Sequence, residues 1–321
     1  MNISIENLKP KSANHVLNKT WNANYGVGFK STIDAYANFI ASNRKLKKLT
    51  DKLFLKQENL SNQQINQYIQ SAVEMTVVRF FAENFPEHFK LEPKLIYGSN
   101  NDVECQFKLN SLLFNIEVKA TSYIEKSKKT EDFSLEFKGH LDNYEELHAT
   151  LQTFLPNLNL EKRFDNNLKS HLCSAQSKFP VTDNNKFCNV LIIGCNDSED
   201  IQKHYDYLHS LHGGFFTKQS FIDNNEFDLV DIVFLTNIFF KHNEIANPKL
   251  NEDSWKLEKS FIVGFRNPFR KNRKEKHLDL IETIVPNYTK SFKEYTGGPK
   301  FIRLRHFIHT ELGMNRKIYH Y

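Results

Sequence analysis

The sequence predicts an α/β protein, α+β in its connectivity, in which helices flank a mixed central sheet. Two observations support this fold class. A long amphipathic stretch at residues 61–85 precedes three short apolar runs, and beyond residue 165 helical and apolar stretches alternate up to Phe240. The expected order is therefore helix, three strands, helix, strand, helix, strand. With 321 residues, the chain is long enough to bury a sizeable core.

The first elements are expected to be helical. Residues 32–60 have apolar residues at mixed spacings of three and four and a basic face, which is typical of a helix. Ser61 is a suitable N-cap for a second, long helix, which Pro86 ends. The apolar stripe of this second helix consists of Ile65, Ile69, Val73, Val77 and Phe80.

Strands dominate the middle of the chain. Candidates lie at residues 89–98, 102–109 and 112–122, and a short polar turn joins the last two. Residues 124–165 are polar and mixed, so we expect an insertion there. The remaining elements are a helix at 166–179, a strand at 188–195, a helix at 198–214 and a strand at 229–240.

The chain divides into three regions by composition. These are an N-terminal helical region at 1–60, a core at 61–245 that contains the insertion at about 124–165, and a basic C-terminal region at 246–321. Residues 256–321 contain 15 Lys plus Arg against 6 Asp plus Glu, whereas the rest of the chain is slightly acidic. This asymmetry favours a polyanionic partner at the C-terminal end, and a solvated basic face is the alternative.

Nothing in the sequence indicates a membrane or an oxidising compartment. The longest apolar run, residues 229–240, contains Asp231 and is shorter than the roughly 18 residues that a membrane span needs. The N-terminus has no continuous apolar segment of a secretory signal. The four cysteines form no Cys-x-x-Cys pair. We therefore expect a cytoplasmic protein with no membrane partner.

Charged residues interrupt the hairpin at residues 101–121. Asp102 and Glu104 open its first strand on one face, and Glu117 and Lys119 share a face of the second. Carboxylates that converge in this way repel one another unless a cation lies between them. Mg²⁺ is the expected cation, because it binds one or two carboxylates and keeps water for a substrate phosphate. A lysine beside it is suited to position the attacking water or to stabilise developing charge.

An acid at the start of one strand, followed by Glu-x-Lys on the next, resembles the PD-(D/E)xK nuclease superfamily. The resemblance covers about the central half of the chain and implies a restriction-endonuclease-like α-β-β-β-α-β core. Asp102 matches the first acid, Glu117 the second and Lys119 the lysine, while Asn101 stands where the name-giving motif has proline. Glu-x-Lys occurs three times in the chain, but only at 117–119 does it follow another acid-bearing strand.

The resemblance also implies roles for these residues. Asp102, Glu117 and the main-chain carbonyl of Val118 would hold Mg²⁺, for which Mn²⁺ is a substitute, and Lys119 would assist the attacking water. Glu74, on the helix before the three strands, would support the site or hold a second metal ion. On the helix after the third strand, Gln176 or Lys178 corresponds to a further site residue of some members.

The function implied by the resemblance is that of a Mg²⁺-dependent endonuclease that hydrolyses DNA, most simply a type II restriction endonuclease. The insertion and the C-terminal region would then supply base recognition, in a homodimer that cuts both strands. Phosphate contacts would come from the basic segment that includes Arg266, Arg270, Lys271, Arg273 and Lys274.

Other interpretations remain open. Asp102, Glu117 and Lys119 would form only a cross-strand ion pair if the hairpin were on the surface. Glu74 and Gln176 are equally compatible with ordinary helix positions. The alternative functions are a non-catalytic nucleic-acid-binding protein that retains the nuclease fold, a repair or defence nuclease without sequence specificity, and an interaction protein such as a host-directed effector.

Overall fold

The computed structural model describes residues 8–39, 43–98, 101–120, 134–135, 144–155, 159–160, 164–181, 186–211, 213–245, 247–271 and 275–311. Its strands are β1 (Lys90–Leu91), β2 (Cys105–Leu109), β3 (Leu112–Ala120), β4 (Ser134–Leu135), β5 (Asn159–Leu160), β6 (Phe187–Gly194), β7 (Ile232–Thr236) and β8 (Ile262–Arg266). Its α-helices are α1 (Val16–Lys19), α2 (Asn24–Ala37), α3 (Asn43–Lys52), α4 (Asn62–Asn84), α5 (Tyr144–Phe154), α6 (Phe164–Gln176), α7 (Ser198–His209), α8 (Ile238–His242), α9 (Glu275–Ile284), α10 (Thr289–Glu294) and α11 (Arg303–Glu311). Short 3₁₀ helices span Pro86–His88, Asn224–Glu226, Glu252–Trp255, Leu257–Lys259 and Lys300–Ile302.

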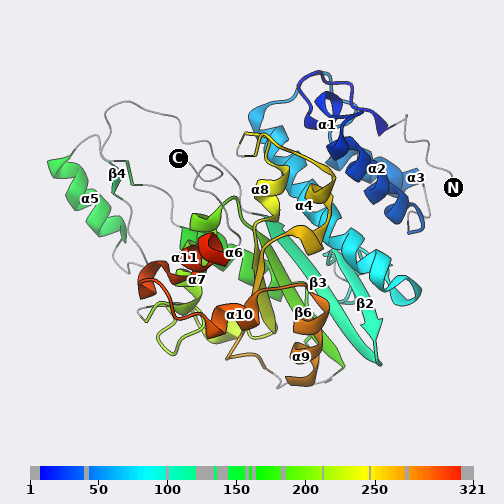
Figure 1. The fold of residues 1–321 in the computed structure, drawn as a ribbon. Helices are drawn as coiled ribbons and strands as arrows, with labels where there is room; N and C mark the ends of the chain where they lie inside the picture. The colour runs from blue at the N-terminus through cyan, green and yellow to red at the C-terminus, as the bar shows by residue number, and fades with distance from the viewer. Residues whose placement is uncertain are drawn as a thin grey trace.

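A six-stranded mixed sheet in the order β1-β2-β3-β6-β7-β8 forms the centre of the molecule (Figure 1). Antiparallel pairing joins β1, β2 and β3, parallel pairing joins β3, β6 and β7, and β8 pairs antiparallel with β7. One face packs against α2, α4, α8 and α9, and the other against α6, α7, α10 and α11. The predicted mixed α/β sheet flanked by helices is thus confirmed. Strand β8 was not predicted.

The helix boundaries agree with the sequence at α4 and differ elsewhere. Ser61 caps α4 through a capping box with Gln64, and the helix ends before Pro86, as predicted. Residues 32–60 were expected to form one helix, but they contribute instead to α2 and α3. The apolar run 229–240 is also divided, since β7 stops at Thr236 and α8 begins at Ile238.

The predicted hairpin forms, but its first strand is shorter than expected, since β2 begins at Cys105 and not at residue 102. Asn110 and Ser111 form its two-residue turn with φ values of 49° and 66°, which suits a type I′ connection. The register pairs Leu109 with Leu112 and Cys105 with Ile116. Between them, the phenyl rings of Phe107 and Phe114 stack at 4.9 Å under α4.

A row of buried amides crosses the sheet on the face that packs against α6. Gln106 Nε2 donates to Asn115 Oδ1 at 2.7 Å, and Asn115 Nδ2 donates to Asn189 Oδ1 at 2.7 Å. Asn189 also bonds the segment before β7, through the carbonyl of Leu229 and the carboxylate of Asp231. We call Gln106, Asn115 and Asn189 the amide row. Because each member is buried and hydrogen-bonded, a slip of register would leave polar groups unpaired.

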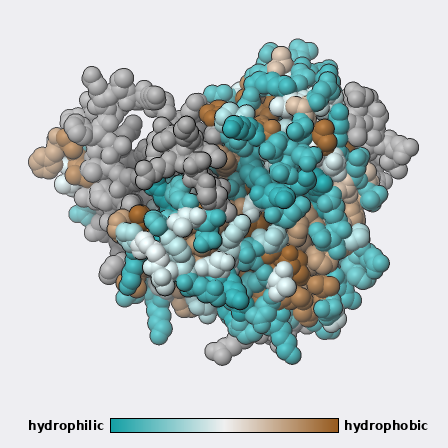
Figure 2. Space-filling view, viewed as in Figure 1, coloured by the Kyte–Doolittle hydropathy of each residue, from teal (hydrophilic) through white to brown (hydrophobic). Residues whose placement is uncertain are grey.

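The surface seen in Figure 2 is largely hydrophilic over α4, with apolar residues gathered between β3 and α9. Within the described residues, no helix has both the length and the apolar character of a membrane span. Most of the expected insertion at 124–165 lies outside the described residues. Its described parts are α5, which lies away from the sheet in Figure 1, and the small parallel pair of β4 and β5.

Candidate active site

Glu117 is the most deeply buried acid of the candidate site. It lies in the middle of β3, between the core residues Ile116 and Val118, and its side chain has no solvent exposure. Two ammonium groups compensate its charge: Lys119 Nζ lies 2.8 Å and Lys178 Nζ 2.6 Å from the same oxygen, Oε1. A buried carboxylate is tolerated when it is paired in this way, and breaking the pairs is costly.

The Glu117 carboxylate keeps unused binding capacity. Its contacts with the lysines are ion pairs, and neither of its oxygens accepts a hydrogen bond of regular geometry from any described residue. Buried polar atoms are nearly always satisfied by a protein group, water or an ion. Oxygen Oε2 is therefore suited to receive a further ligand that the described residues do not supply.

Glu104 lies beside Glu117. Continuing the β2–β3 register from Cys105 and Ile116 by one residue sets Glu104 opposite Glu117, and the chain bends at this point. Burial, the charge of Glu74 and the charge of Glu117 raise the pKa of Glu104 to about 8. A carboxyl group in this environment is stabilised in its ionised form by an added cation.

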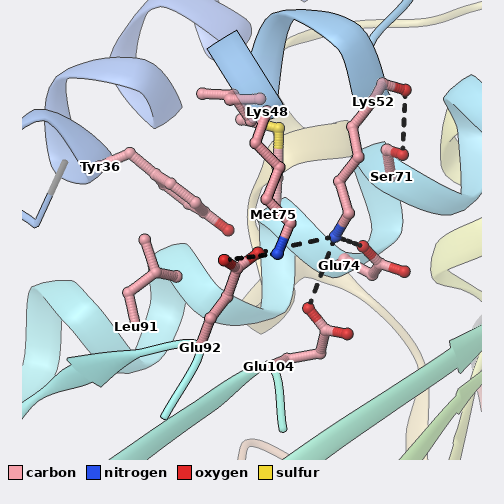
Figure 3. A pocket seen from close by; sticks show the side chains of 10 residues that line it. Tyr36, Lys48, Lys52, Ser71, Glu74, Met75, Leu91, Glu92 and Glu104 are labelled. Carbon is pink, nitrogen blue, oxygen red and sulfur yellow. Dashed lines mark hydrogen bonds and ion pairs between the residues drawn. The ribbon is translucent and has the colours of Figure 1, made fainter. Parts of the chain in front are cut away.

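A small pocket that opens to solvent is lined in part by Glu104. At its centre, Lys52 Nζ lies 2.7 Å from Glu74 Oε2 and 3.9 Å from both Glu92 Oε1 and Glu104 Oε2 (Figure 3). These carboxylates come from α4, from the end of β1 and from the start of β2, whereas the lysine comes from α3. The pocket lining comprises Tyr36, Lys48, Leu49, Lys52, Ser71, Glu74, Met75, Leu91, Glu92 and Glu104.

A second lysine of α3 closes the outer side of the pocket. Lys48 Nζ lies 2.9 Å from Glu92 Oε2 and 3.7 Å from Asp102 Oδ2. Glu92 has a left-handed backbone, with φ at 48°, although it is followed by Pro93. A non-glycine residue in this conformation costs free energy, and such strain is concentrated at functional sites.

The structure changes the assignment of the first acid. Asp102 was expected to converge with Glu117, but its side chain is 36% exposed and its ion-pair contact is with Lys48. The bend at Glu104 is the physical reason, because it ends the regular ladder before Asp102 is reached. Glu104, two residues later, occupies the position beside Glu117. Both acids were visible in the sequence, but the choice between them depended on where β2 begins.

The fold brings some of the remaining predicted residues to the site and places others elsewhere. Lys178 and Lys119 reach Glu117, and Glu74 is connected to Glu104 through Lys52. Gln176 instead braces the segment before β7: it donates to Asp228 Oδ1 at 2.7 Å and accepts from the main-chain nitrogen of Leu229 at 2.8 Å. The side chain of Val118 is buried in the core that packs against α4.

Arg266, the first member of the predicted basic segment, does not lie at this site. Arg266, at the end of β8, donates to Glu282 at 2.9 and 2.6 Å and also pairs with Glu275 and Asp279, all on α9. Helix α9 packs on the sheet face opposite to α6, so Arg266 is held away from Glu117 by its own acidic partners. This arrangement does not support the expected phosphate contact by Arg266.

Two other members of the basic segment are described. Arg270 pairs with Glu275 and donates to the carbonyl of Asn267 at 2.7 Å, whereas the side chain of Lys271 is exposed. Arg273 and Lys274 lie outside the described residues.

Four residues of the site were missed by sequence reasoning. Glu92 begins another of the three Glu-x-Lys triplets, but its central Pro93 suits a strand interior poorly, and Glu104 shares the alternation of its strand. Lys48 and Lys52 carry no local signal beyond the basic face of α3, because tertiary packing alone brings them to the acids. His171 on α6 also lies near, since burial, His204 and the charge of Lys119 lower its pKa to about 3.

The described residues can bind Mg²⁺ through two carboxylates and water, but not through a cluster of three side chains. Within the described part of the chain, no group of three His, Cys, Asp or Glu side chains is arranged to hold a metal ion. Mg²⁺ does not require such a group, because one or two carboxylates and several waters suffice. The unsatisfied Glu117 carboxylate and the neighbouring Glu104 provide two such ligands.

Comparisons with known proteins add no relative to this picture. No protein-family model matches the chain, and neither the curated proteins nor the solved structures contain a significant match to it.

Proposed function

We propose that this protein is a Mg²⁺-dependent endonuclease that hydrolyses phosphodiester bonds in DNA. The observation that supports the proposal best is the fully buried Glu117 carboxylate, with two lysines at one oxygen and Glu104 alongside. Hydrolysis of a phosphodiester requires stabilisation of the charge that develops on the phosphate and a positioned water, and lysines and carboxylates supply both.

In this proposal, each side chain has a separate task. Glu104 and Glu117 would hold the metal ion, which would supply charge stabilisation and lower the pKa of bound water. Lys119, about a quarter exposed, orients the attacking water. Lys178 pairs with Glu117 Oε1 and adds positive charge on the side of α6. Glu74 supports the site by holding Lys52.

The order of elements is consistent with this function. If β4, α5 and β5 of the insertion are set aside, helix α4, strands β1, β2 and β3, helix α6 and strand β6 have the order α-β-β-β-α-β implied by the resemblance to PD-(D/E)xK nucleases. The active lysine and glutamate lie on the third of these strands. We extend the proposal to a type II restriction endonuclease that acts as a homodimer in the cytoplasm, with DNA as its partner.

Plasmid and single-strand cleavage in excess Mg²⁺ tests the proposal, with wild type compared with Glu117→Gln and Lys119→Met. Lys108→Met is a matched control, because Lys108 is exposed on the adjacent strand β2. We expect cleavage by wild type and by the control, and none by the two site variants or in EDTA. Discrete bands support the restriction assignment, and a smear supports a nuclease without sequence specificity.

Equal cleavage by wild type and Glu117→Gln would refute the assignment of the site. If wild type binds DNA without cutting it in any divalent cation, the protein is instead a binding protein that retains the nuclease fold.

A further inference from the structure

Lys52 of α3 lies among three carboxylates that have no other positive charge between them in the described residues. Three carboxylates, those of Glu74, Glu92 and Glu104, surround Lys52 Nζ at 2.7, 3.9 and 3.9 Å (Figure 3). They come from three different segments of the chain, so their convergence is a property of the tertiary structure. Without a positive charge at this point, the three carboxylates would repel one another strongly.

Lys52 is built into this position by the packing of α3. Leu49 and Leu53, on either side of it in the sequence, are buried in the core under α4. The carbonyl of Lys52 accepts a hydrogen bond from Ser71 Oγ at 3.3 Å, which ties the end of α3 to α4. The ammonium group is therefore delivered to the acids by a fixed element of the fold.

The charges of the whole site can be compared. Five carboxylates, of Glu74, Glu92, Asp102, Glu104 and Glu117, are paired with four ammonium groups, of Lys48, Lys52, Lys119 and Lys178. When all five carboxylates are ionised, the sum of these formal charges is −1. One divalent cation changes the total to +1, which matches one phosphodiester anion. A second divalent cation would raise the total to +3, more than one phosphodiester anion offsets.

We propose that Lys52 is a built-in counter-cation that takes the place of a second metal ion, so that the site binds one divalent cation and not two. This inference rests on the proposed metal-dependent function, but its test counts bound ions and does not require cleavage activity. Lys52 is a positioning residue: it holds Glu74 and Glu104 and touches no reacting atom. Removal of its charge turns the pocket of Glu74, Glu92 and Glu104 into a divalent-cation site.

The test counts bound Mn²⁺ in the absence of DNA, by electron paramagnetic resonance titration of the free ion. Lys52→Met removes the charge and keeps a long apolar side chain. We expect it to bind one more Mn²⁺ per chain than wild type. Lys47→Met is the matched control, because Lys47 is exposed on the same helix, and it should bind as many ions as wild type.

A double variant locates the new ion. Lys52→Met combined with Glu74→Gln removes one positive and one negative charge together, and it should return to the wild-type number of ions. Lys52→Met alone should have a low melting temperature in EDTA that rises when Mn²⁺ is added, since the ion replaces the ammonium group.

Two results would overturn the inference: an equal number of ions in wild type and Lys52→Met, or a Lys52→Met chain that stays unfolded in saturating Mn²⁺. Cleavage assays are separate from this count. If wild type cuts no nucleic acid but Lys52→Met gains an ion, the proposed function fails and the role of Lys52 stands. If wild type cuts DNA and Lys52→Met gains no ion, the reverse holds.

Discussion

The ammonium group of Lys178 lies 2.6 Å from Oε1 of Glu117, at the point where the turn after α6 meets β3. Glu117 has no solvent exposure, and Lys178 is only 16% exposed, so water screens this pair weakly. The pair connects the helical layer to the strand that carries both Glu117 and Lys119. Several testable consequences follow from this arrangement and from those around it.

Replacing Lys178 with Met should remove one of the two charges that stabilise Glu117. We expect the cleavage rate to fall by about 100-fold or more, as for loss of one electrostatic contact in an active site. The free energy of unfolding should fall by about 1–3 kcal/mol, because Lys119 still compensates the carboxylate. Single-turnover cleavage and urea unfolding measure the two effects. Lys169→Met, an exposed position on α6, is the control and should change neither.

Glu104 and Asp102 should respond differently to isosteric substitution. Glu104→Gln keeps the shape of the side chain but removes an oxygen that can ionise to bind a cation beside Glu117, so we expect cleavage and Mg²⁺ binding to be lost together. Asp102→Asn should cut at nearly the wild-type rate, since Asp102 is partly exposed and pairs with Lys48. Mg²⁺ titrations of the cleavage rate distinguish the two variants. The reverse order of effects would restore Asp102 as the first acid.

Stability should decrease as the pH falls below about 6.5, partly because of His242. Its two ring nitrogens form hydrogen bonds with the hydroxyl groups of Tyr25 and Thr76, and burial followed by the charge of Lys241 lowers its pKa to about 3. Between pH 6.5 and 3, the unfolded chain therefore binds a proton that the folded chain does not. One such group lowers the free energy of unfolding by up to about 1.4 kcal/mol per pH unit as the pH falls.

Urea unfolding of wild type and His242→Gln at pH 7.5, 6.5 and 5.0 measures this contribution. The difference in free energy between the two proteins should shrink as the pH falls. His88→Gln, at an exposed position, should show a difference that does not change with pH. A constant difference for His242→Gln would show that this histidine does not contribute to the pH dependence.

Arg266 should matter for stability and not for binding of nucleic acid. Its two hydrogen bonds to Glu282, which is 17% exposed, anchor α9 to β8, whereas Asp279 is 67% exposed. We expect Glu282→Ala to cost about 1–2 kcal/mol of unfolding free energy and Asp279→Ala less than about 0.5 kcal/mol. Arg266→Ala should retain wild-type affinity for DNA in a mobility-shift assay. Weaker binding that is less sensitive to salt would instead indicate a phosphate contact.

The sequence was most informative where a local pattern repeats. The alternation of polar and apolar residues predicted the β2–β3 hairpin, and Ser61 and Pro86 predicted the limits of α4. Glu117, Lys119 and Lys178 were all recognised as candidates. Strand β8 was missed because it is short, contains Gly264 and lies between polar segments, so only its pairing with β7 identifies it.

Other parts of the site could not be predicted, for physical reasons. The identity of the first acid depended on where the chain bends before β2. Hydrogen bonds between two neighbouring segments set this position: Glu92 N donates to the carbonyl of Glu104 at 3.1 Å, and Val103 N donates to the carbonyl of Pro93 at 3.3 Å. The positions of Lys48 and Lys52 depended on how Leu49 and Leu53 pack against α4. Neither relationship has a signature in the order of residues along one segment.

The amide row has a consequence for how this protein tolerates change. Gln106 and Asn115 lie two residues from Glu104 and Glu117 respectively, and they hold β2, β3 and β6 in alignment without any help from the acids. Chains whose acids have been replaced should therefore keep the same strand alignment and still present the surrounding surface. A one-residue insertion in the Asn110–Ser111 turn, although far from the acids and exposed, should be more damaging than substitution of the acids themselves. Substitution of the acids should therefore be tolerated in evolution more easily than a change in the length of the Asn110–Ser111 turn.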